Sequence, residues 1–378
     1  MKKFLIVLAV ILVALFIVAV AFISQSAKFM KGKVPSLKEG SVLEIDLSEG
    51  FPEVGGYDFS GFKFDRKTDF LTLISAVEEA AEDDNIKAAV LRTAGMTLDQ
   101  ARVHELDAAL DKFRENEKPI YCFLNSAGMG GYLMASSADS IFISPPGELM
   151  LLGMSIAPMF YAGTAEKLGI GFDVIPMGKY KGAAEYFTGT GFTPPLRESM
   201  GELLAGLFDY WSGAITESRG LGEGDIEEIL EYGVYHSDEA LEAGLVDGIL
   251  YPQEFEERME ELAGGDEDRM VGISDYAAGK DFHSGSRKVA LVNCLGSIHT
   301  GKTEGNPFGG SPTIGSKTFV DILEDIIEDD DVEAVVMRVN SPGGSALASD
   351  IIWESVRRLA EKKPVVVSMG AVAASGGY

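Results

Sequence analysis

The chain has 378 residues, of which 46% are hydrophobic and 24% are charged, and its formal net charge at pH 7 is −27. These proportions are typical of a globular protein that is long enough for two domains. The negative charge argues against nucleic acid and against anionic membrane surfaces as main partners. Cys122 and Cys294 lie in apolar runs and are interpreted as buried thiols, and the four scattered histidines indicate neither a metal site nor a histidine base.

The sequence begins with a candidate membrane anchor. Residues 4–23 are apolar and carry no charge. Such a run is long enough to span a bilayer and exceeds the apolar core of a signal peptide, which has ~7–15 residues. A cleaved signal is the alternative, because small residues follow the run. We expect residues 1–27 to form a transmembrane helix with its flanks.

Strand-like and helical patterns alternate through residues 41–262. Residues 87–91 predict a buried strand, and residues 98–113 predict a helix. This alternation predicts an α/β fold in which crossover helices connect the strands of a parallel sheet. Residues 263–287 are rich in Gly, Asp and Ser and predict a linker. A second α/β unit is expected at residues 288–378.

The segment at residues 288–378 repeats the segment at residues 41–262, and the two are called the second and the first repeat. Residues 78–92 resemble residues 324–338, and Gly130 and Tyr132 match Gly376 and Tyr378, all at an offset of 246 residues. Several anchors at one spacing predict a tandem duplication of one fold. Because the first repeat continues well beyond Tyr132, the second repeat is predicted to be truncated at Tyr378.

A serine follows a predicted strand near the C-terminal end of the sequence. Residues 365–369 are mostly β-branched, and the small residues at 370–377 allow a sharp turn into a helix. Ser375 at this corner can present its hydroxyl to a cleft, and the amide of Gly376 can bind an oxyanion. On the motif alone, a tightly packed strand–helix junction explains the stretch equally well.

A second turn, residues 340–344, follows another predicted strand of the same unit. Its backbone amides suit a ligand, so that Gly343 or Gly344 can form an oxyanion hole with Gly376. An ordinary turn is the simpler alternative. We favour a functional role for the turn because the first repeat lacks both features, and has Met129 in place of the serine.

A serine nucleophile needs a base, and a lysine is the available candidate. Lys181 follows a predicted strand at residues 172–177 and lies among Gly, Ala and aromatic residues, and Lys179 is equally close. Apolar burial lowers the pKa of a lysine enough for it to act as a base. For either lysine an exposed surface position is the commoner outcome, and Glu185 could pair with Lys181 and oppose the shift.

Three motifs together carry a family resemblance: residues 180–185, 338–344 and 368–378. With them, the chain resembles the long, two-repeat form of signal peptide peptidase A, a bacterial membrane-anchored serine protease of family S49. The resemblance implies two repeats of the fold shared by Clp proteases and crotonases. It also implies a Ser/Lys dyad in which Ser375 is the nucleophile and Lys181 the general base, whereas Lys179 does not match.

The resemblance further implies an endopeptidase that degrades cleaved signal peptides at the extracytoplasmic face of the cytoplasmic membrane. It implies a homo-oligomer, expected to be a tetramer, that uses neither a cofactor nor a metal. One site would need both repeats. Two alternatives stay open: a crotonase-type acyl-CoA hydratase or isomerase, suggested by residues 235–247, and a non-catalytic membrane-tethered assembly factor. The anchor argues against the first, and the intact site residues argue against the second.

Overall fold

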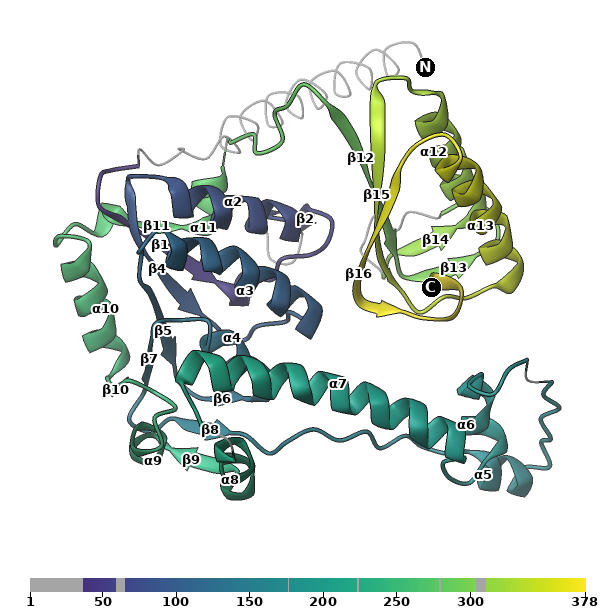
Figure 1. The fold of residues 1–378 in the computed structure, drawn as a ribbon, viewed down its shortest axis with the longest axis horizontal. Helices are drawn as coiled ribbons and strands as arrows, with labels where there is room; N and C mark the ends of the chain where they lie inside the picture. The colour runs from purple at the N-terminus through teal and green to yellow at the C-terminus, as the bar shows by residue number, and fades with distance from the viewer. Residues whose placement is uncertain (1–36, 59–64, 176, 223, 279, 304–310) are drawn as a thin grey trace, which may run out of the picture. The chain divides into compact units, whose positions relative to one another are not determined.

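The computed structural model describes residues 37–378 except 59–64, 176, 223, 279 and 304–310 (Figure 1). The predicted anchor lies outside the described residues. Within them, no helix combines the length and the apolar character needed to cross a membrane. The chain divides into two compact units, which we describe separately. These units differ in extent from the predicted repeats: of the described residues, the first unit comprises those up to 44, 51–87 and 263–378, and the second comprises those at 45–50 and 88–262.

The largest sheet has six strands in the order β10-β7-β5-β4-β1-β11. The pairs β1–β11, β4–β5, β5–β7 and β7–β10 are all parallel. The parallel α/β class predicted from the sequence is therefore confirmed. The strand bounds are Ser41–Asp46 (β1), Ile86–Arg92 (β4), Ile120–Leu124 (β5), Ser140–Ile143 (β7), Gly248–Ile249 (β10) and Met270–Gly272 (β11).

Two crossover helices begin at aspartate caps. Asp69 precedes α2 (Phe70–Glu82) and Asp99 precedes α3 (Gln100–Glu115), and each carboxylate accepts a hydrogen bond from a backbone amide of the first turn. Such a cap satisfies an amide that the helix itself leaves unpaired. Because Asp99 is the cap, α3 begins two residues later than the pattern at 98–113 predicts.

The second unit contains a long helix, α7 (Pro194–Arg219), with α5 (Ala162–Lys167) and α6 (Glu185–Thr188) beside its N-terminal end (Figure 1). Trp211 of α7 is fully buried and donates a hydrogen bond to the carbonyl of Met129 at 2.9 Å. The predicted strand at residues 172–177 is wrong for those that the structure describes. They have no regular secondary structure and are exposed, and no neighbouring strand among the described residues pairs with them.

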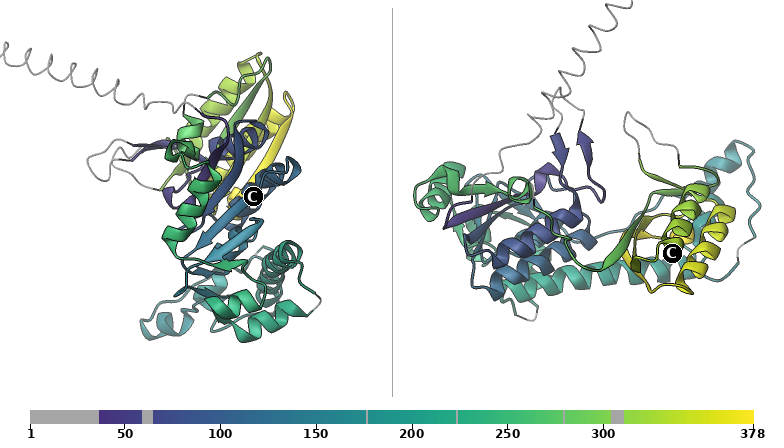
Figure 2. Two further views of the ribbon diagram at one scale, coloured as in Figure 1. Left: turned by 90° about the vertical axis from the view of Figure 1, so that its left-hand side faces the viewer. Right: turned by 90° about the horizontal axis from the view of Figure 1, so that it is seen from above.

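The C-terminal part of the first unit holds a three-stranded parallel sheet in the order β12-β15-β16. Its strands are Lys288–Leu295 (β12), Val332–Ser341 (β15) and Val365–Ala373 (β16). Figures 1 and 2 show α12 (Ser316–Glu328) and α13 (Ala346–Ala360) on one face of this sheet. The core between them includes Val292, Leu323, Val335 and Leu359.

Corresponding elements follow one spacing along the chain. The starts of α2 and α12, of β4 and β15, and of α3 and α13 are each separated by 246 residues. The strands β1, β4 and β5 are neighbours in the same sequential order as β12, β15 and β16. These shared intervals are what a duplicated sequence leads one to expect.

Smaller elements complete the two units. The first unit has β2 (Gly56–Asp58), β3 (Asp65–Lys67), α11 (Ile273–Ala277), β13 (Ser297–His299) and β14 (Thr313–Gly315). The second has β6 (Ala127–Gly128), α4 (Met129–Ala135), β8 (Glu148–Met150), α8 (Asp225–Tyr232), β9 (Val234–His236), α9 (Ser237–Glu242) and α10 (Pro252–Leu262). Of these, β13 is the element that matters most for the site.

Candidate active site

Ser375 opens a short 3-10 turn, Ser375–Gly377, directly after β16. Its φ angle is +53°, in the left-handed region that residues with a side chain seldom adopt. Such a conformation costs ~1–3 kcal/mol and recurs at functional sites. The side chain is exposed, and its hydroxyl has no hydrogen-bond partner in the part of the chain that the structure describes. The structure therefore has a strained and exposed serine at the position where the sequence predicted a nucleophile.

The glycine turn after β15 touches the serine turn. Gly343 has a φ angle of +84°, and a Cβ built on it would lie 2.9 Å from the Cβ of Ser375 and 2.6 Å from the amide nitrogen of Gly376. A Cβ on Gly344 would lie 2.0 Å from the carbonyl oxygen of Ile298. Only glycine fits at these contacts, because real Cβ atoms do not approach other atoms so closely. The structure thus brings Ser375, Gly376, Gly343 and Gly344 together.

The backbone amides at this junction differ in availability. The amide of Gly343 donates a hydrogen bond to the Oγ of Ser341 at 3.1 Å. Among the described residues, the amides of Gly344 and Gly376 have no acceptor. Of the three predicted oxyanion donors, Gly344 and Gly376 are therefore the two whose amides remain available to a ligand.

The strand β13 orients the peptide that carries the Gly344 amide. The carbonyl of Gly343 accepts a hydrogen bond from the amide of Ile298 at 2.9 Å, and the amide of Ser345 donates to the carbonyl of Ile298 at 2.9 Å. In a trans peptide the N–H points away from the preceding carbonyl. Because the Gly343 carbonyl faces β13, the Gly344 N–H faces away from that strand.

Lys181 belongs to the second unit and immediately precedes a 3-10 turn, Gly182–Ala184. Its side chain is exposed and, among the described residues, forms no ion pair. Glu185 does not pair with it. Instead, the Glu185 carboxylate accepts a hydrogen bond from the Thr193 hydroxyl at 2.6 Å. The ammonium of Lys181 is therefore not neutralised by the neighbour that the sequence suggested.

Lys179 has a different setting. Its ammonium donates to the hydroxyl of Tyr180 at 2.9 Å and forms an ion pair with Glu198 at 3.1 Å. The hydrogen bonds to Tyr180 and Glu198 raise the pKa of Lys179 above its usual value. A lysine with a raised pKa is a poorer base at neutral pH, so these contacts favour Lys181. Since Lys181 and Ser375 lie in different units, neither unit by itself contains both residues of the predicted dyad.

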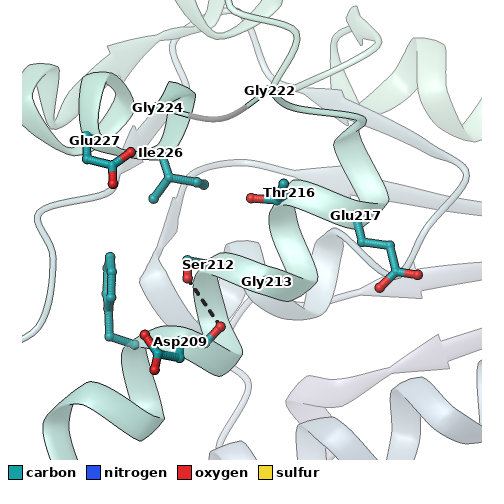
Figure 3. A pocket seen from close by; sticks show the side chains of 10 residues that line it. Asp209, Ser212, Gly213, Thr216, Glu217, Gly222, Gly224, Ile226 and Glu227 are labelled. Carbon is teal, nitrogen blue, oxygen red and sulfur yellow. Dashed lines mark hydrogen bonds between the residues drawn. The ribbon is translucent and has the colours of Figure 1, made fainter.

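Two other features of the structure bear on the kind of site. In the described ranges, no three His, Cys, Asp or Glu side chains are grouped closely enough to hold a metal ion. Figure 3 shows a surface pocket of about 600 Å³ that is lined by residues of α7 and α8, among them Asp209, Thr216 and Glu227. None of the predicted site residues lines it.

Two contributors to this junction were missed in the sequence. Ser341 lies inside the turn already singled out, so its proximity was a usable signal. Ile298 lies more than forty residues earlier in the sequence, and nothing in its local pattern marks it. Its role arises from the pairing of β13 with the turn, which includes a parallel bridge between Ile298 and Gly344.

A parallel α/β fold with a strained serine beside free backbone amides is typical of a serine hydrolase. The comparisons with known proteins narrow this class. Residues 112–266 match the model of Peptidase family S49. The chain is 28% identical over 79% of its length to the chloroplastic serine protease SPPA of Arabidopsis thaliana, and 30% identical over 81% to protease 4 of Salmonella typhi. These similarities connect the chain with peptidase family S49, whose model matches residues 112–266, and with a serine protease.

The matches differ in how much of each relative they cover. The chain spans 45% of the Arabidopsis protein and 51% of the Salmonella protein, which is about half of each. A putative signal peptide peptidase SppA of Enterococcus faecium is 25% identical over 58% of this chain and 64% of its own. Among solved structures, an enoyl-CoA hydratase/isomerase family protein from Silicibacter pomeroyi covers 57% of this chain and 73% of its own, with 18% identity and a TM-score of 0.32. That score is too low to support an assignment.

Proposed function

We propose that this chain forms a serine endopeptidase in which Ser375 is the nucleophile and Lys181 the general base. The observation that carries the proposal is the contact between the strained turn of Ser375 and the Gly343–Gly344 turn, where two backbone amides have no acceptor among the residues that the structure describes. Such amides stabilise the negative charge that develops on a carbonyl oxygen during acyl transfer. The similarity of residues 112–266 to peptidase family S49 supports the same reaction.

The proposed mechanism has two steps. The neutral amine of Lys181 takes the proton from the Ser375 hydroxyl while its oxygen attacks the peptide carbonyl, and the amides of Gly344 and Gly376 hold the oxyanion. The protonated lysine then gives the proton to the leaving amine, and an acyl-enzyme forms. Water, deprotonated by the lysine, attacks the ester carbonyl, and the lysine then returns this proton to the departing serine oxygen, which releases the acid product and restores the serine and the neutral amine. The amine must be neutral to take this proton, and burial in apolar surroundings favours the uncharged form of an amine.

The assembled protein supplies what one unit lacks. We propose that the chain arose by tandem duplication, with the lysine kept in residues 41–262 and the serine in residues 288–378. One active site then needs both repeats, from the same chain or from a neighbouring copy in a homo-oligomer such as a tetramer. Approach of another surface would also exclude water from Lys181, which is exposed in the described chain and needs burial to become a base.

The substrates that we propose are cleaved signal peptides and other peptides at the extracytoplasmic face of the cytoplasmic membrane. The apolar run at residues 4–23 would anchor the chain there. The name of the Enterococcus relative supports this substrate class, and the serine protease relatives favour a peptidase over an acyl-CoA hydratase. Fractionation of cells that express the chain with and without residues 1–27 tests the anchor, which predicts membrane association only for the former.

The test of the reaction compares the wild-type protein with Ser375→Ala and Lys181→Ala on a fluorogenic signal-peptide substrate. We expect both variants to lose more than ~10³-fold in kcat, since each removes a member of one catalytic unit. Lys179→Ala is the matched control, because it removes a lysine two residues away that is paired with Glu198, and it should retain activity. Hydrolysis that persists in Lys181→Ala would refute the assignment of the base.

A further inference from the structure

Ser341 occupies the centre of the junction between β13, the glycine turn and the serine turn. It is the last residue of β15 and is fully buried. Its hydroxyl donates to the carbonyl of Gly296 at 2.6 Å and accepts from the amide of Gly343 at 3.1 Å. Its own carbonyl accepts from the amide of Ala374, the residue before the candidate nucleophile, at 3.1 Å. One residue thus contacts all three segments that build the site.

The Ser341 side chain determines how the first peptide of the glycine turn is oriented. The N–H of Gly343 belongs to the peptide between Pro342 and Gly343, and the hydrogen bond to Ser341 directs that N–H inwards. The following peptide is held by Ile298. Gly343 joins the two peptides, and a glycine rotates easily because it lacks a Cβ. Without the Ser341 hydroxyl, the first of these two peptides would lose its hydrogen bond, and only the second, which Ile298 holds, would keep one.

Burial makes this arrangement worth more than a surface hydrogen bond. A buried amide without an acceptor is unfavourable, because it has lost its hydrogen bond to water and gained none in return. If the hydroxyl were removed, the Gly343 amide would lose its acceptor, and rotation of this N–H towards another acceptor would stabilise the turn. Rotation about Gly343 would turn the Gly344 amide away from its present direction.

The corresponding position in the first repeat indicates that the Ser341 hydroxyl serves the site and is not required for the fold. At the 246-residue offset that relates α2 to α12 and β4 to β15, Ser341 corresponds to Gly95. The first half thus forms its strand and helix without a serine there. The hydroxyl is present only in the half that carries Ser375.

We propose that Ser341 is a positioning residue whose hydroxyl holds the Gly343 amide inward and thereby keeps the Gly344 amide directed at the oxyanion. This role rests on the proposed peptidase function. It predicts a defect in the chemical step and not in the binding of substrate, because an oxyanion forms only after attack on the carbonyl.

The experiment uses the full chain and measures kcat and KM for Ser341→Ala and Ser341→Cys beside the wild type. Loss of one oxyanion donor lowers kcat by ~10²–10³-fold, so a misdirected donor should lower kcat by at least ~10-fold, with KM changed by less than ~3-fold. Ser341→Cys keeps a group of similar size that is a weaker hydrogen-bond partner, and it should retain more activity than Ser341→Ala. The matched control is Ser355→Ala, another buried serine of the same unit, whose hydroxyl bonds only within α13.

The outcomes separate this inference from the function on which it rests. A wild-type kcat in Ser341→Ala would overturn the role of Ser341 and leave the peptidase intact. An equal fall in kcat for Ser355→Ala would also overturn it, because burial alone would then explain the effect. An inert wild type would overturn the proposed function and with it this role. If Ser341→Ala fails to fold, a folded Ser341→Cys with unchanged kcat would overturn the proposal.

Discussion

The hydroxyl of Ser349 on α13 occupies the space beside Gly376, where a Cβ would lie 2.1 Å from its Oγ and 2.9 Å from its Cβ. Ser349 is held in turn, since its hydroxyl donates to the carbonyl of Ser345 at 3.0 Å. The turn that presents Ser375 is therefore packed directly against the first turns of α13. The helix α13, which also covers one face of the sheet, therefore helps to set the position of the candidate nucleophile.

This contact predicts that Gly376→Ala inactivates the protein. The added methyl group cannot fit beside Ser349, so the turn must shift, and the amide of residue 376 and the hydroxyl of Ser375 shift with it. We expect kcat to fall by at least ~10²-fold, as when an oxyanion donor is lost. Peptide hydrolysis measures the effect. Gly206→Ala is the control, because nothing lies within 4 Å of a Cβ at that position of α7.

The same contact predicts a rescue. Ser349→Gly removes both atoms that a Cβ on residue 376 would meet, at a cost of about 0.5–1 kcal/mol for a glycine inside a helix. The double variant Gly376→Ala with Ser349→Gly should regain activity relative to Gly376→Ala alone. No gain in the double variant would show that the defect of Gly376→Ala has another origin.

A buried ion pair within the first unit should contribute strongly to its stability. The guanidinium of Arg338 on β15 bonds the carboxylate of Glu53 at 3.1 Å, and their side chains are only 7% and 11% exposed. Loss of the Glu53 carboxylate breaks a buried ion pair, which costs ~3–5 kcal/mol. Glu53→Ala should therefore lower the free energy of unfolding by that amount in chemical denaturation. Asp321→Ala, which breaks the exposed pair with Lys317, should change it by less than ~1 kcal/mol.

Acid should weaken the protein partly through Asp83. Burial would raise the pKa of this carboxyl group, but hydrogen bonds from Asn85 and Tyr276 and the nearby Lys280 together lower its pKa below the usual value. A group with a lowered pKa in the folded state stabilises the protein above its unfolded pKa, and this stabilisation is lost as the pH falls through the folded pKa. Between pH 7 and pH ~3, urea denaturation should therefore show a smaller loss of stability for Asp83→Asn than for the wild type. A loss equal to that of the wild type would contradict this account. Asp84→Asn at the exposed neighbouring position is the control.

The two thiols should be inert in the folded protein. Burial raises the pKa of Cys122 and of Cys294 to about 12 in each case. Because the thiolate is the reactive form, neither should react with iodoacetamide at pH 8 until the protein unfolds. Mass spectrometry after labelling with and without urea measures this, and rapid native labelling at either residue would contradict its burial.

Local pattern was a good guide to some elements and a poor guide to others. The buried strand β4 and, to within two residues at each end, the helix α3 agree with the prediction, because burial and helical periodicity leave their signal within a few residues. The apolar run at residues 172–177 read as a strand, but a strand exists only when another strand pairs with it. That partner is a property of the tertiary structure, and none is present among the described residues.

The candidate site divides in the same way. The sequence by itself determined the residue types of the site: a serine and two glycine turns after predicted strands, and a pair of neighbouring lysines. Only the tertiary structure decided how their backbone amides are bonded. Gly343 and Gly344 are adjacent in the sequence, yet the amide of the first donates to Ser341, while that of the second has no acceptor in the described part of the chain. The difference arises because Ile298 and Ser341 hold the two successive peptides in opposite senses, and β13 reaches the turn only when the chain has folded.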